Sequence, residues 1–397
     1  MIQKHIKPIV YQHPAGFIFT LLVFILLAVA CQHDIYQGNS AAEQAGKPIG
    51  RAALKYAKGF SIVYYKNFKQ VNIYNYEGKN KDTAQYILIK RGGIIPDGFP
   101  NAQIIETPVR SIIGMSSMHV ALIDFAEADA VLTGLGNLKY ASAAKVREYI
   151  KAGKIKEVGQ ETNLNNEMVL TMHPDLMMAV GNVHAKVNRF NVLTKAGIPV
   201  IQNSEFLEST PLGRAEWVKL MAVLVDKEEL VNKKFNAVDV EYNRLVKLAE
   251  KTATKPHVIT GMPIKGTWYM PQGNSYLTHF LHDAGGFSKW SHEEGIGTLP
   301  LSFEMVAPEA LNADYWLNIG YVSSKADMTG RDSRFADFKP FKTGHVYNFN
   351  KKINDAGAND YWESGAVNPQ LVLSDLIKIL HPELLPGHQL IYYQQLK

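Results

Sequence analysis

An apolar run occupies residues 17–31 and ends at Cys31, the only cysteine of the chain. Lys4 and Lys7 precede this run, and no acidic residue occurs among the first thirty positions. A basic start, an apolar middle and small residues at the end are typical of a secretory signal. The run is also shorter than the roughly 20 residues that a membrane-spanning helix needs. The pattern therefore predicts a signal peptide over residues 1–30, with a single transmembrane anchor as the alternative.

Polar and small residues dominate residues 31–52, which predicts a flexible tether. Three segments then alternate β-branched, aromatic and polar residues, with Gly-, Asn- and Asp-containing turns between them. These segments are residues 60–65, 71–76 and 85–90. We expect them to form a small antiparallel sheet within a β-rich extension over residues 53–106.

From residue 107 onward, short apolar segments alternate with amphipathic ones. Strands that alternate with helices indicate a parallel sheet covered on both faces, so residues 107–212 are predicted to form an α/β lobe. The expected strands lie at residues 111–115, 154–159, 176–180 and 198–201, and a helix is expected over residues 117–126.

A long helical pattern follows the first lobe. Apolar residues recur at helical spacing over residues 213–252, and neither Pro nor Gly occurs between Arg214 and Lys255. We therefore predict one connecting helix over residues 213–255 and a second α/β lobe over residues 256–397.

Two segments in the two lobes match each other. One begins at Glu167 and the other at Glu304, and each reads Glu-Met-Val before an amphipathic stretch, an Asp and an apolar strand ending in Gly. The match predicts that the lobes are structural duplicates. Coincidence between two ordinary helix-to-strand transitions is the alternative.

Charge and cysteine content narrow the function classes. The formal net charge is +5, and it becomes smaller when Lys4 and Lys7 leave with the signal peptide. A balance this small does not predict nucleic-acid binding, which needs a concentrated basic face. Residues 27–31, Leu-Ala-Val-Ala-Cys, resemble a bacterial lipobox, in which the cysteine is lipidated. With Cys31 lipidated, the mature domain has no thiol for a disulfide, a metal site or a nucleophile.

An ordered set of segments carries a family resemblance. The chain resembles the solute-binding proteins of ABC importers for metal chelates, a family of ferric-siderophore, haem and vitamin B12 receptors with a helical backbone. The matching segments are residues 107–123, 172–176, 211–219, 283–286 and 368–383. The resemblance spans about residues 107–385, so the β-rich extension lies outside it.

The resemblance implies a fold and a function. The fold would be α/β, with two Rossmann-like lobes joined by a long helix, as in a class III periplasmic binding protein. Such lobes close only slightly, so the cleft would be largely formed before a bulky ligand binds. The implied function is capture of an iron-siderophore, or else of cobalamin or haem, for an ABC permease dimer and its ATPase. The receptor would be a monomer without enzymatic activity, held by its lipid at a membrane facing the periplasm, inner or outer.

The same resemblance assigns a docking role to two glutamates. An acidic residue on each lobe of such receptors binds arginines of the permease, and Glu167 and Glu304 stand at these positions. A carboxylate at a helix start suits the helix dipole, and its pair with arginine can be bidentate. The alternative is an ordinary acidic residue in a first helical turn.

Cleft residues in such a fold come from loops at the carboxyl ends of strands. Aromatic residues there could stack on a macrocycle or catecholate, and arginines could pair with an anionic siderophore. For the aromatic residues, the alternative is packing under a loop. For the arginines, the alternative is a solvated loop. His119 could ligate iron or cobalt, but a hydrogen-bonding structural role at a helix start is favoured. The candidates are Met115, Ser116, His119 and Tyr140 in the first lobe, and Trp268, Tyr269, Arg331 and Arg334 in the second.

Two other classes of function compete with a receptor. A lipid-anchored periplasmic hydrolase or transferase would be expected to have a nucleophile elbow. The chain contains no Gly-x-Ser-x-Gly pattern, which is the sequence signature of such an elbow. The sequence also contains no clustered His or carboxylate motif for a bare metal ion. A structural surface lipoprotein could use the β-rich extension, but the paired lobes argue against it.

Overall fold

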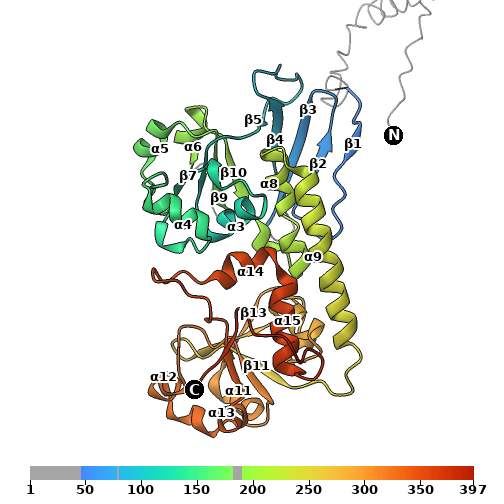
Figure 1. Ribbon diagram of the computed structural model, residues 1–397, viewed down its shortest axis with the longest axis vertical. Helices are drawn as coiled ribbons and strands as arrows, with labels where there is room; N and C mark the ends of the chain where they lie inside the picture. The colour runs from blue at the N-terminus through green and yellow to red at the C-terminus, as the bar shows by residue number, and fades with distance from the viewer. Residues whose placement is uncertain (1–45, 78–79, 182–189) are drawn as a thin grey trace, which may run out of the picture.

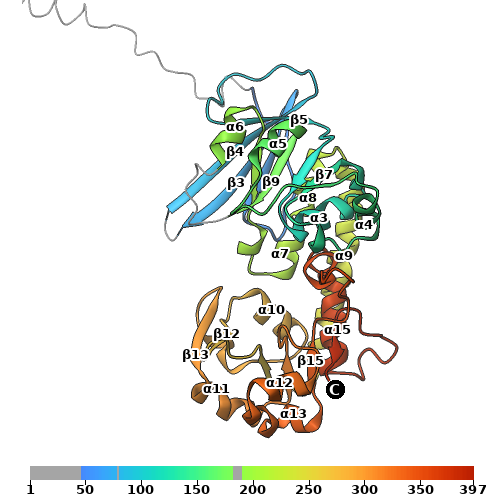
Figure 2. The same ribbon diagram turned by 90° about the vertical axis from the view of Figure 1, so that its left-hand side faces the viewer.

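The computed structural model describes residues 46–77, 80–181 and 190–397. The predicted signal peptide, Cys31 and most of the predicted tether lie outside these residues. Two lobes are stacked along the long axis of the molecule, and the helix α9 (Glu228–Ala249) runs down one side of both (Figure 1). Turned by 90°, the helices α7 and α10 face each other across the lobe boundary (Figure 2).

A parallel sheet forms the centre of the upper lobe, as the alternating pattern predicts. Its strand order is β10-β9-β6-β7-β8, and every neighbouring pair is parallel. The middle strand consists of apolar residues and glycine and is buried along its length, because helices cover both faces of the sheet. The strands are β6 (Ile112–Gly114), β7 (Leu132–Leu135), β8 (Lys156–Glu157), β9 (Leu176–Val180) and β10 (Val200–Asn203), and the helices are α3 (Ser117–Phe125), α4 (Ala144–Lys151), α5 (Asn166–Met172) and α6 (Asn191–Lys195).

The β-rich extension is a five-stranded sheet in the order β1-β2-β3-β4-β5. The three predicted strands are β2, β3 and β4, and they pair antiparallel as expected. The strands β1 and β5 were not predicted, and β5 pairs parallel to β4. The predicted tether is also too long, because the Ile49 amide already donates to the Tyr64 carbonyl. The strands are β1 (Gly50–Arg51), β2 (Phe60–Tyr64), β3 (Phe68–Glu77), β4 (Asn80–Lys90) and β5 (Gln103–Thr107).

This extension is part of the upper lobe and not an appendage. Its apolar face, including Phe60, Val71 and Ile73, belongs to the same buried cluster as α3 and α8. The Tyr86 hydroxyl donates to the Val200 carbonyl at 3.0 Å, and Gln103 bonds both the amide and the carbonyl of Val200. The two sheets of the upper lobe therefore share one core.

The predicted connecting helix is wrong in its continuity. The chain forms α7 (Pro211–Ala215), α8 (Val218–Leu224) and α9, and Asp226 between the last two adopts a φ of 54°. Every apolar residue of α8 is buried, whereas α9 buries only one stripe of its surface, so the chain must turn between them. Absence of Pro and Gly does not prevent this turn, since an Asp tolerates the left-handed conformation.

The lower lobe repeats part of the upper one. β11, β14 and β15 are parallel, β16 pairs antiparallel to β15, and β12 and β13 form a separate two-stranded antiparallel sheet. The helix α11 leads into β14 between β11 and β15, as α5 leads into β9 between β6 and β10. The two Glu-Met-Val segments therefore occupy equivalent topological positions, which supports duplication. The elements are β11 (Val258–Thr260), β12 (Thr267–Pro271), β13 (Thr298–Ser302), β14 (Tyr315–Leu317), β15 (Val346–Asn348), β16 (Gln394–Gln395), α10 (Tyr276–Asp283), α11 (Phe303–Ala310), α12 (Lys325–Arg331), α13 (Lys339–Thr343), α14 (Ser364–Val367) and α15 (Pro369–Leu380).

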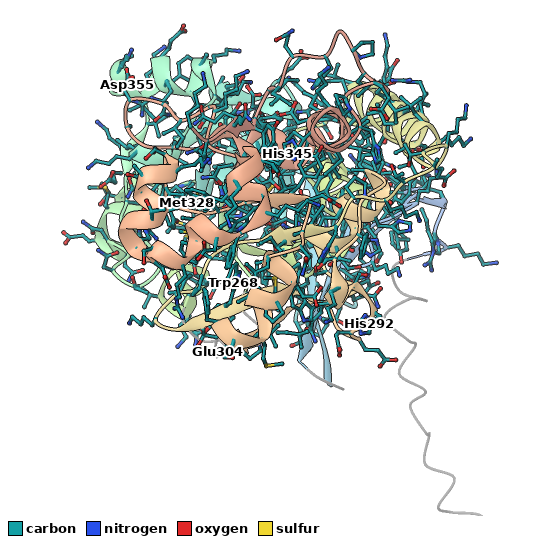
Figure 3. The ribbon with its side chains drawn as sticks, turned by 90° about the horizontal axis from the view of Figure 1, so that it is seen from below. Trp268, His292, Glu304, Met328, His345 and Asp355 are labelled. Carbon is teal, nitrogen blue, oxygen red and sulfur yellow. The ribbon has the colours of Figure 1, made fainter. Side chains whose placement is uncertain are left out.

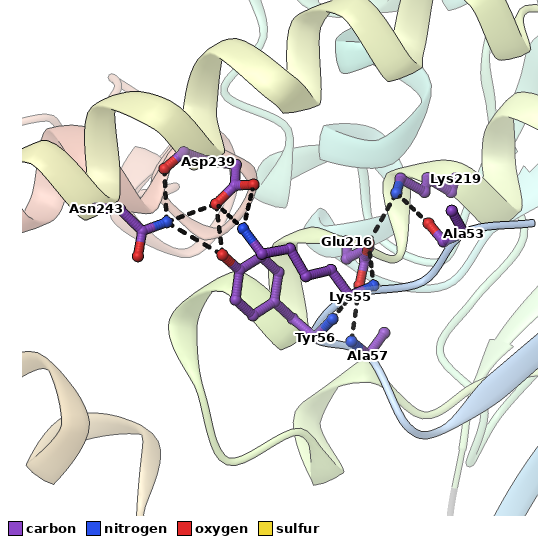
Figure 4. Close-up of polar contacts among 8 residues, drawn as sticks. All are labelled: Ala53, Lys55, Tyr56, Ala57, Glu216, Lys219, Asp239 and Asn243. Atoms are coloured by element: carbon purple, nitrogen blue, oxygen red, sulfur yellow. Dashed lines mark hydrogen bonds and ion pairs between the residues drawn. The ribbon is translucent and has the colours of Figure 1, made fainter.

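A buried carboxylate fastens the start of the extension to the helices of the lobe boundary (Figure 4). Glu216 is fully buried and accepts hydrogen bonds from the amides of Lys55, Tyr56 and Ala57 at 2.7–3.0 Å. The Lys219 ammonium lies 2.7 Å from the same carboxylate. The side chain of Lys55 reaches Asp239 on α9 at 2.8 Å. None of the helices in the described residues is both long and apolar enough to cross a membrane.

We expect Glu216→Ala to lower the free energy of unfolding by about 3 kcal/mol, because it leaves three amides, of which that of Ala57 is buried, without their acceptor. Equilibrium urea unfolding measures this loss. Glu241→Ala, which removes an exposed ion pair with Arg244 on α9, is the matched control and should cost only about 0.3 kcal/mol. Equal losses in the two variants would contradict the assigned role of Glu216.

Candidate functional site

A cavity of about 650 Å³ lies between the lobes. The upper lobe contributes Ser117 and Tyr140, and the lower lobe contributes the loop after β14 and the segment after β15. Both contributions follow the carboxyl ends of parallel strands, where open α/β sheets place ligands. The lining residues are Ser117, Tyr140, Gly320, Tyr321, Val322, Ser323, Phe349, Asn350, Ile353, Gly357, Ala358, Asn359 and Trp362.

His119 lies inside the upper lobe and does not line this cavity. Its side chain is buried, and Nδ1 accepts a hydrogen bond from the Met115 amide at 3.0 Å. Burial lowers the pKa of His119 to about 3, so the imidazole is neutral. The structure therefore supports the structural alternative for His119 and not metal ligation. The candidates Met115 and Ser116 line a narrow recess that shares Ser117 and Tyr140 with the cavity.

Three side chains hold the loop of residues 320–323 in place. Asn348 donates to the carbonyls of Gly320 at 2.7 Å and Val322 at 3.0 Å, and Asn350 also donates to Val322. Arg331 donates to the Tyr321 carbonyl at 2.7 Å. The backbone of Tyr321 is thus fixed, while its side chain is 99% exposed.

Aromatic side chains form the wall of the cavity in the lower lobe. Phe349 stacks on Tyr361 with ring centroids 4.6 Å apart, and Trp362 meets Phe349 edge-on at 5.3 Å and Tyr361 edge-on at 4.8 Å. Trp362 remains 48% exposed. Because neighbouring rings fix Trp362 from behind, this wall is formed without a ligand.

Glu363 joins the two lobes directly beside this wall. Its buried carboxyl group accepts hydrogen bonds from the amides of Ser142 at 2.8 Å and Ala143 at 2.6 Å, just before α4 of the upper lobe. Asn354 adds a bond to the Ala141 carbonyl at 2.9 Å, from a turn that Gly357 closes with a φ of 90°. Burial raises the pKa of Glu363 to about 8, although the two amides oppose this shift.

Trp268 is not a cleft residue. It is fully buried, its indole nitrogen donates to the Thr260 carbonyl at 2.8 Å, and it packs against Trp316 and Phe338 in the core of the lower lobe (Figure 3). Tyr269 on β12 is half exposed, but it does not line the cavity. Trp268 therefore packs inside the lobe, which was the alternative to stacking on a ligand.

The two candidate arginines also lie outside the cavity. Arg334 forms an ion pair with Asp332 at 2.6 Å, and its guanidinium lies 3.7 Å from the centre of the Phe303 ring. Arg331 donates a hydrogen bond to the Tyr321 carbonyl. Both line a separate pocket beside Phe303, so neither of them lines the cavity between the lobes.

Glu167 and Glu304 occupy the first turns of α5 and α11, and both are exposed. Figure 3 places Glu304 at the margin of the lower lobe, whereas Trp268 lies inside it. Hydrogen bonds from its own amide and from Ser302 lower the pKa of Glu304, and Arg334 adds to this effect. Both carboxylates are therefore available on the surface for a cationic partner.

Sequence reasoning missed Phe349 and Trp362 as cleft residues. Phe349 follows the carboxyl end of β15, so correct strand boundaries would have found it. Trp362 lies far from any strand end, in a segment without a motif. In the part of the chain that the structure describes, no group of three His, Cys, Asp or Glu residues could hold a metal ion.

Comparisons with known proteins agree with this geometry. A sequence profile described as periplasmic binding protein matches residues 130–352. Two uncharacterized lipoproteins of Methanocaldococcus jannaschii are 25% and 24% identical to the chain, over 95% and 91% of its length and 94% and 91% of theirs.

Two solved structures share the fold. A periplasmic heme-binding protein from Pseudomonas aeruginosa has a TM-score of 0.54 at 14% identity, covering 73% of this chain and 98% of that one. A TroA-like periplasmic binding protein from Veillonella parvula has a TM-score of 0.54 at 15% identity, covering 74% and 96%.

We expect Glu363→Gln to remove part of the dependence of stability on pH. With a pKa near 4.5 unfolded and about 8 folded, the folded state holds the extra proton across this window, so stability falls as pH rises through it. Glutamine cannot ionise, yet its oxygen can still accept a bond. Urea unfolding at several pH values should therefore show a shallower slope for Glu363→Gln than for the wild type or for the exposed control Glu294→Gln. An unchanged slope would contradict the assignment.

Proposed function

Since the matched profile covers more than half of it, the chain belongs to the periplasmic binding protein family, and we propose that it is the lipid-anchored receptor of an ABC importer for metal chelates. The family resemblance inferred from the sequence is confirmed, as is the class of two α/β lobes joined by a helix. Members of this family are solute-binding proteins and not enzymes, and they work with a permease and its ATPase.

The observation that carries the proposal is the cavity between the lobes. Its volume lies in the range of small-molecule sites, about 300–1,000 Å³. Its wall is held by the Phe349–Tyr361–Trp362 cluster and by the Glu363 bonds across the boundary. A site fixed in this way loses little conformational entropy when a rigid ligand binds. Rigid, bulky ligands with apolar surface suit such a site.

Within this class, we place an iron-siderophore first as the ligand, with cobalamin or haem as the alternative. A similar fold in a heme-binding protein of Pseudomonas aeruginosa is compatible with either choice. A structural lipoprotein would not need a cavity shared by two lobes, and an enzyme would not be expected in a family of solute-binding proteins.

The anchor and the docking face complete the proposal. Cys31 would carry the lipid, as the names of the two Methanocaldococcus lipoproteins also suggest for their chains. Tethering would raise the concentration of the receptor near its permease. Glu167 and Glu304, in equivalent helices of the two lobes, would bind arginines of the two permease subunits.

The receptor function predicts tight binding of a metal chelate without turnover. Isothermal titration of the purified protein with ferric siderophores, haem and cyanocobalamin measures binding, and analysis of the recovered ligand detects turnover. A visible absorption spectrum and a native mass spectrum of protein from its own host would identify the natural ligand. Failure to bind all of these chelates, together with turnover of any substrate, would overturn the proposal.

For docking, we expect Glu167→Ala combined with Glu304→Ala to leave chelate affinity unchanged and to abolish uptake. Cellular uptake of the radiolabelled chelate and titration of the purified variant measure the two properties separately. Glu229→Ala combined with Glu294→Ala removes two other exposed carboxylates and should leave uptake intact. Weakened chelate binding in the first variant would show that these residues do not lie on a docking face.

A further inference from the structure

The cavity between the lobes has an uncharged lining. Among the described residues that line it, none is Asp, Glu, Lys, Arg or His. The exposed rings of Tyr140, Tyr321 and Trp362 supply aromatic surface, and Ile353 adds an exposed aliphatic side chain. The site therefore offers apolar contact and neutral dipoles but no ion pair.

Three cations next to lining residues of the lower lobe are bound within the protein. Lys351 donates to the Leu390 carbonyl, and Lys352 pairs with Asp360 at 3.3 Å. Arg331 donates to the Tyr321 carbonyl and lines a different pocket. Moving Arg331 to a ligand would break the bond that fixes the backbone of Tyr321, a lining residue.

The two amide side chains of the lining also form hydrogen bonds within the protein. Asn350 donates to the Val322 carbonyl and accepts from Gln394 at 2.9 Å. Asn359 donates to the Phe349 carbonyl and accepts from the Tyr361 amide. The hydroxyl groups of Ser117, Ser323, Tyr140 and Tyr321 make no hydrogen bond to any described residue. Hydroxyls are therefore the polar groups that face a ligand.

An anionic ligand would lose its hydration in this cavity and gain no cation in exchange, which is costly. A metal with an open coordination position would find no imidazole, thiolate or carboxylate in the lining. We propose that the cavity selects electrically neutral, coordinatively saturated chelates, held by aromatic contact with Tyr321, Phe349 and Trp362 and by the four hydroxyls. This inference rests on the proposed receptor function and narrows its ligand to one charge class.

The test compares two neutral and two anionic probes by isothermal titration at low and high salt. The neutral probes are a ferric tris-hydroxamate and cyanocobalamin, and the anionic ones are a ferric tris-catecholate and haem. We expect at least one neutral probe to bind about tenfold more tightly than either anionic probe, with an affinity that salt does not change. Tighter, salt-sensitive binding of the tris-catecholate or of haem would overturn the inference and leave the receptor function standing. Failure of all four probes to bind would instead count against the receptor function itself.

Variants of Tyr321 test the mode of contact, because this exposed side chain adds little to the core. We expect Tyr321→Ala to weaken binding of the neutral probe about tenfold, as loss of an aromatic anchor does, and Tyr321→Phe to keep most of the affinity. Tyr269→Ala, an exposed aromatic outside the cavity, is the matched control and should bind as the wild type does. A phenol can ligate ferric iron. Loss of affinity in Tyr321→Phe with a change in the visible spectrum of the bound chelate would therefore overturn the saturated-chelate inference.

Discussion

The geometry of the cleft depends on the buried carboxyl group of Glu363, which fixes the lower lobe to the start of α4 in the upper lobe. Burying this group is unfavourable for its charged form, and the raised pKa expresses that cost. The bonds to the amides of Ser142 and Ala143 offset part of it, and the positive end of the α4 dipole acts in the same direction. Trp362 precedes Glu363 and Tyr140 lies two residues before Ser142, so one contact sets the positions of aromatic residues on both sides of the cavity.

The rest of the architecture limits motion of the lobes around this contact. The β-rich extension shares the core of the upper lobe, and its first residues are bound to Glu216 and to Asp239 on α9. The connecting helix is thereby held by the upper lobe along part of its length, while α14 of the lower lobe packs against α3 and α7. We therefore expect the cavity to be formed before a ligand binds and to change little on binding.

Much of the fold follows from periodicity and composition, because burial on two faces of a parallel sheet leaves a visible pattern. The strand β9 and the helix α3 were predicted almost to the residue. The turn at Asp226 could not be predicted, since a polar residue that tolerates the left-handed conformation carries no distinctive pattern. The antiparallel pairing in the extension was predicted for the three strands that short turns connect, whereas β5, which pairs parallel after a longer connection, was not predicted as a strand.

The site was harder to predict than the fold. Tyr140 lies where the rule for strand ends places it. Trp268 was expected in a loop after β11 but lies inside β12 and is buried, because it packs against distant residues such as Phe338. Arg331 and Arg334 have partners within the lobe that no sequence spacing reveals. Amide hydrogen exchange at Ser142 and Ala143 in the ligand-free protein tests the account most directly. We expect slow exchange at both amides with and without a bound chelate, because the Glu363 bonds exist before binding. Fast exchange that becomes slow only when a chelate binds would contradict a cavity formed in advance.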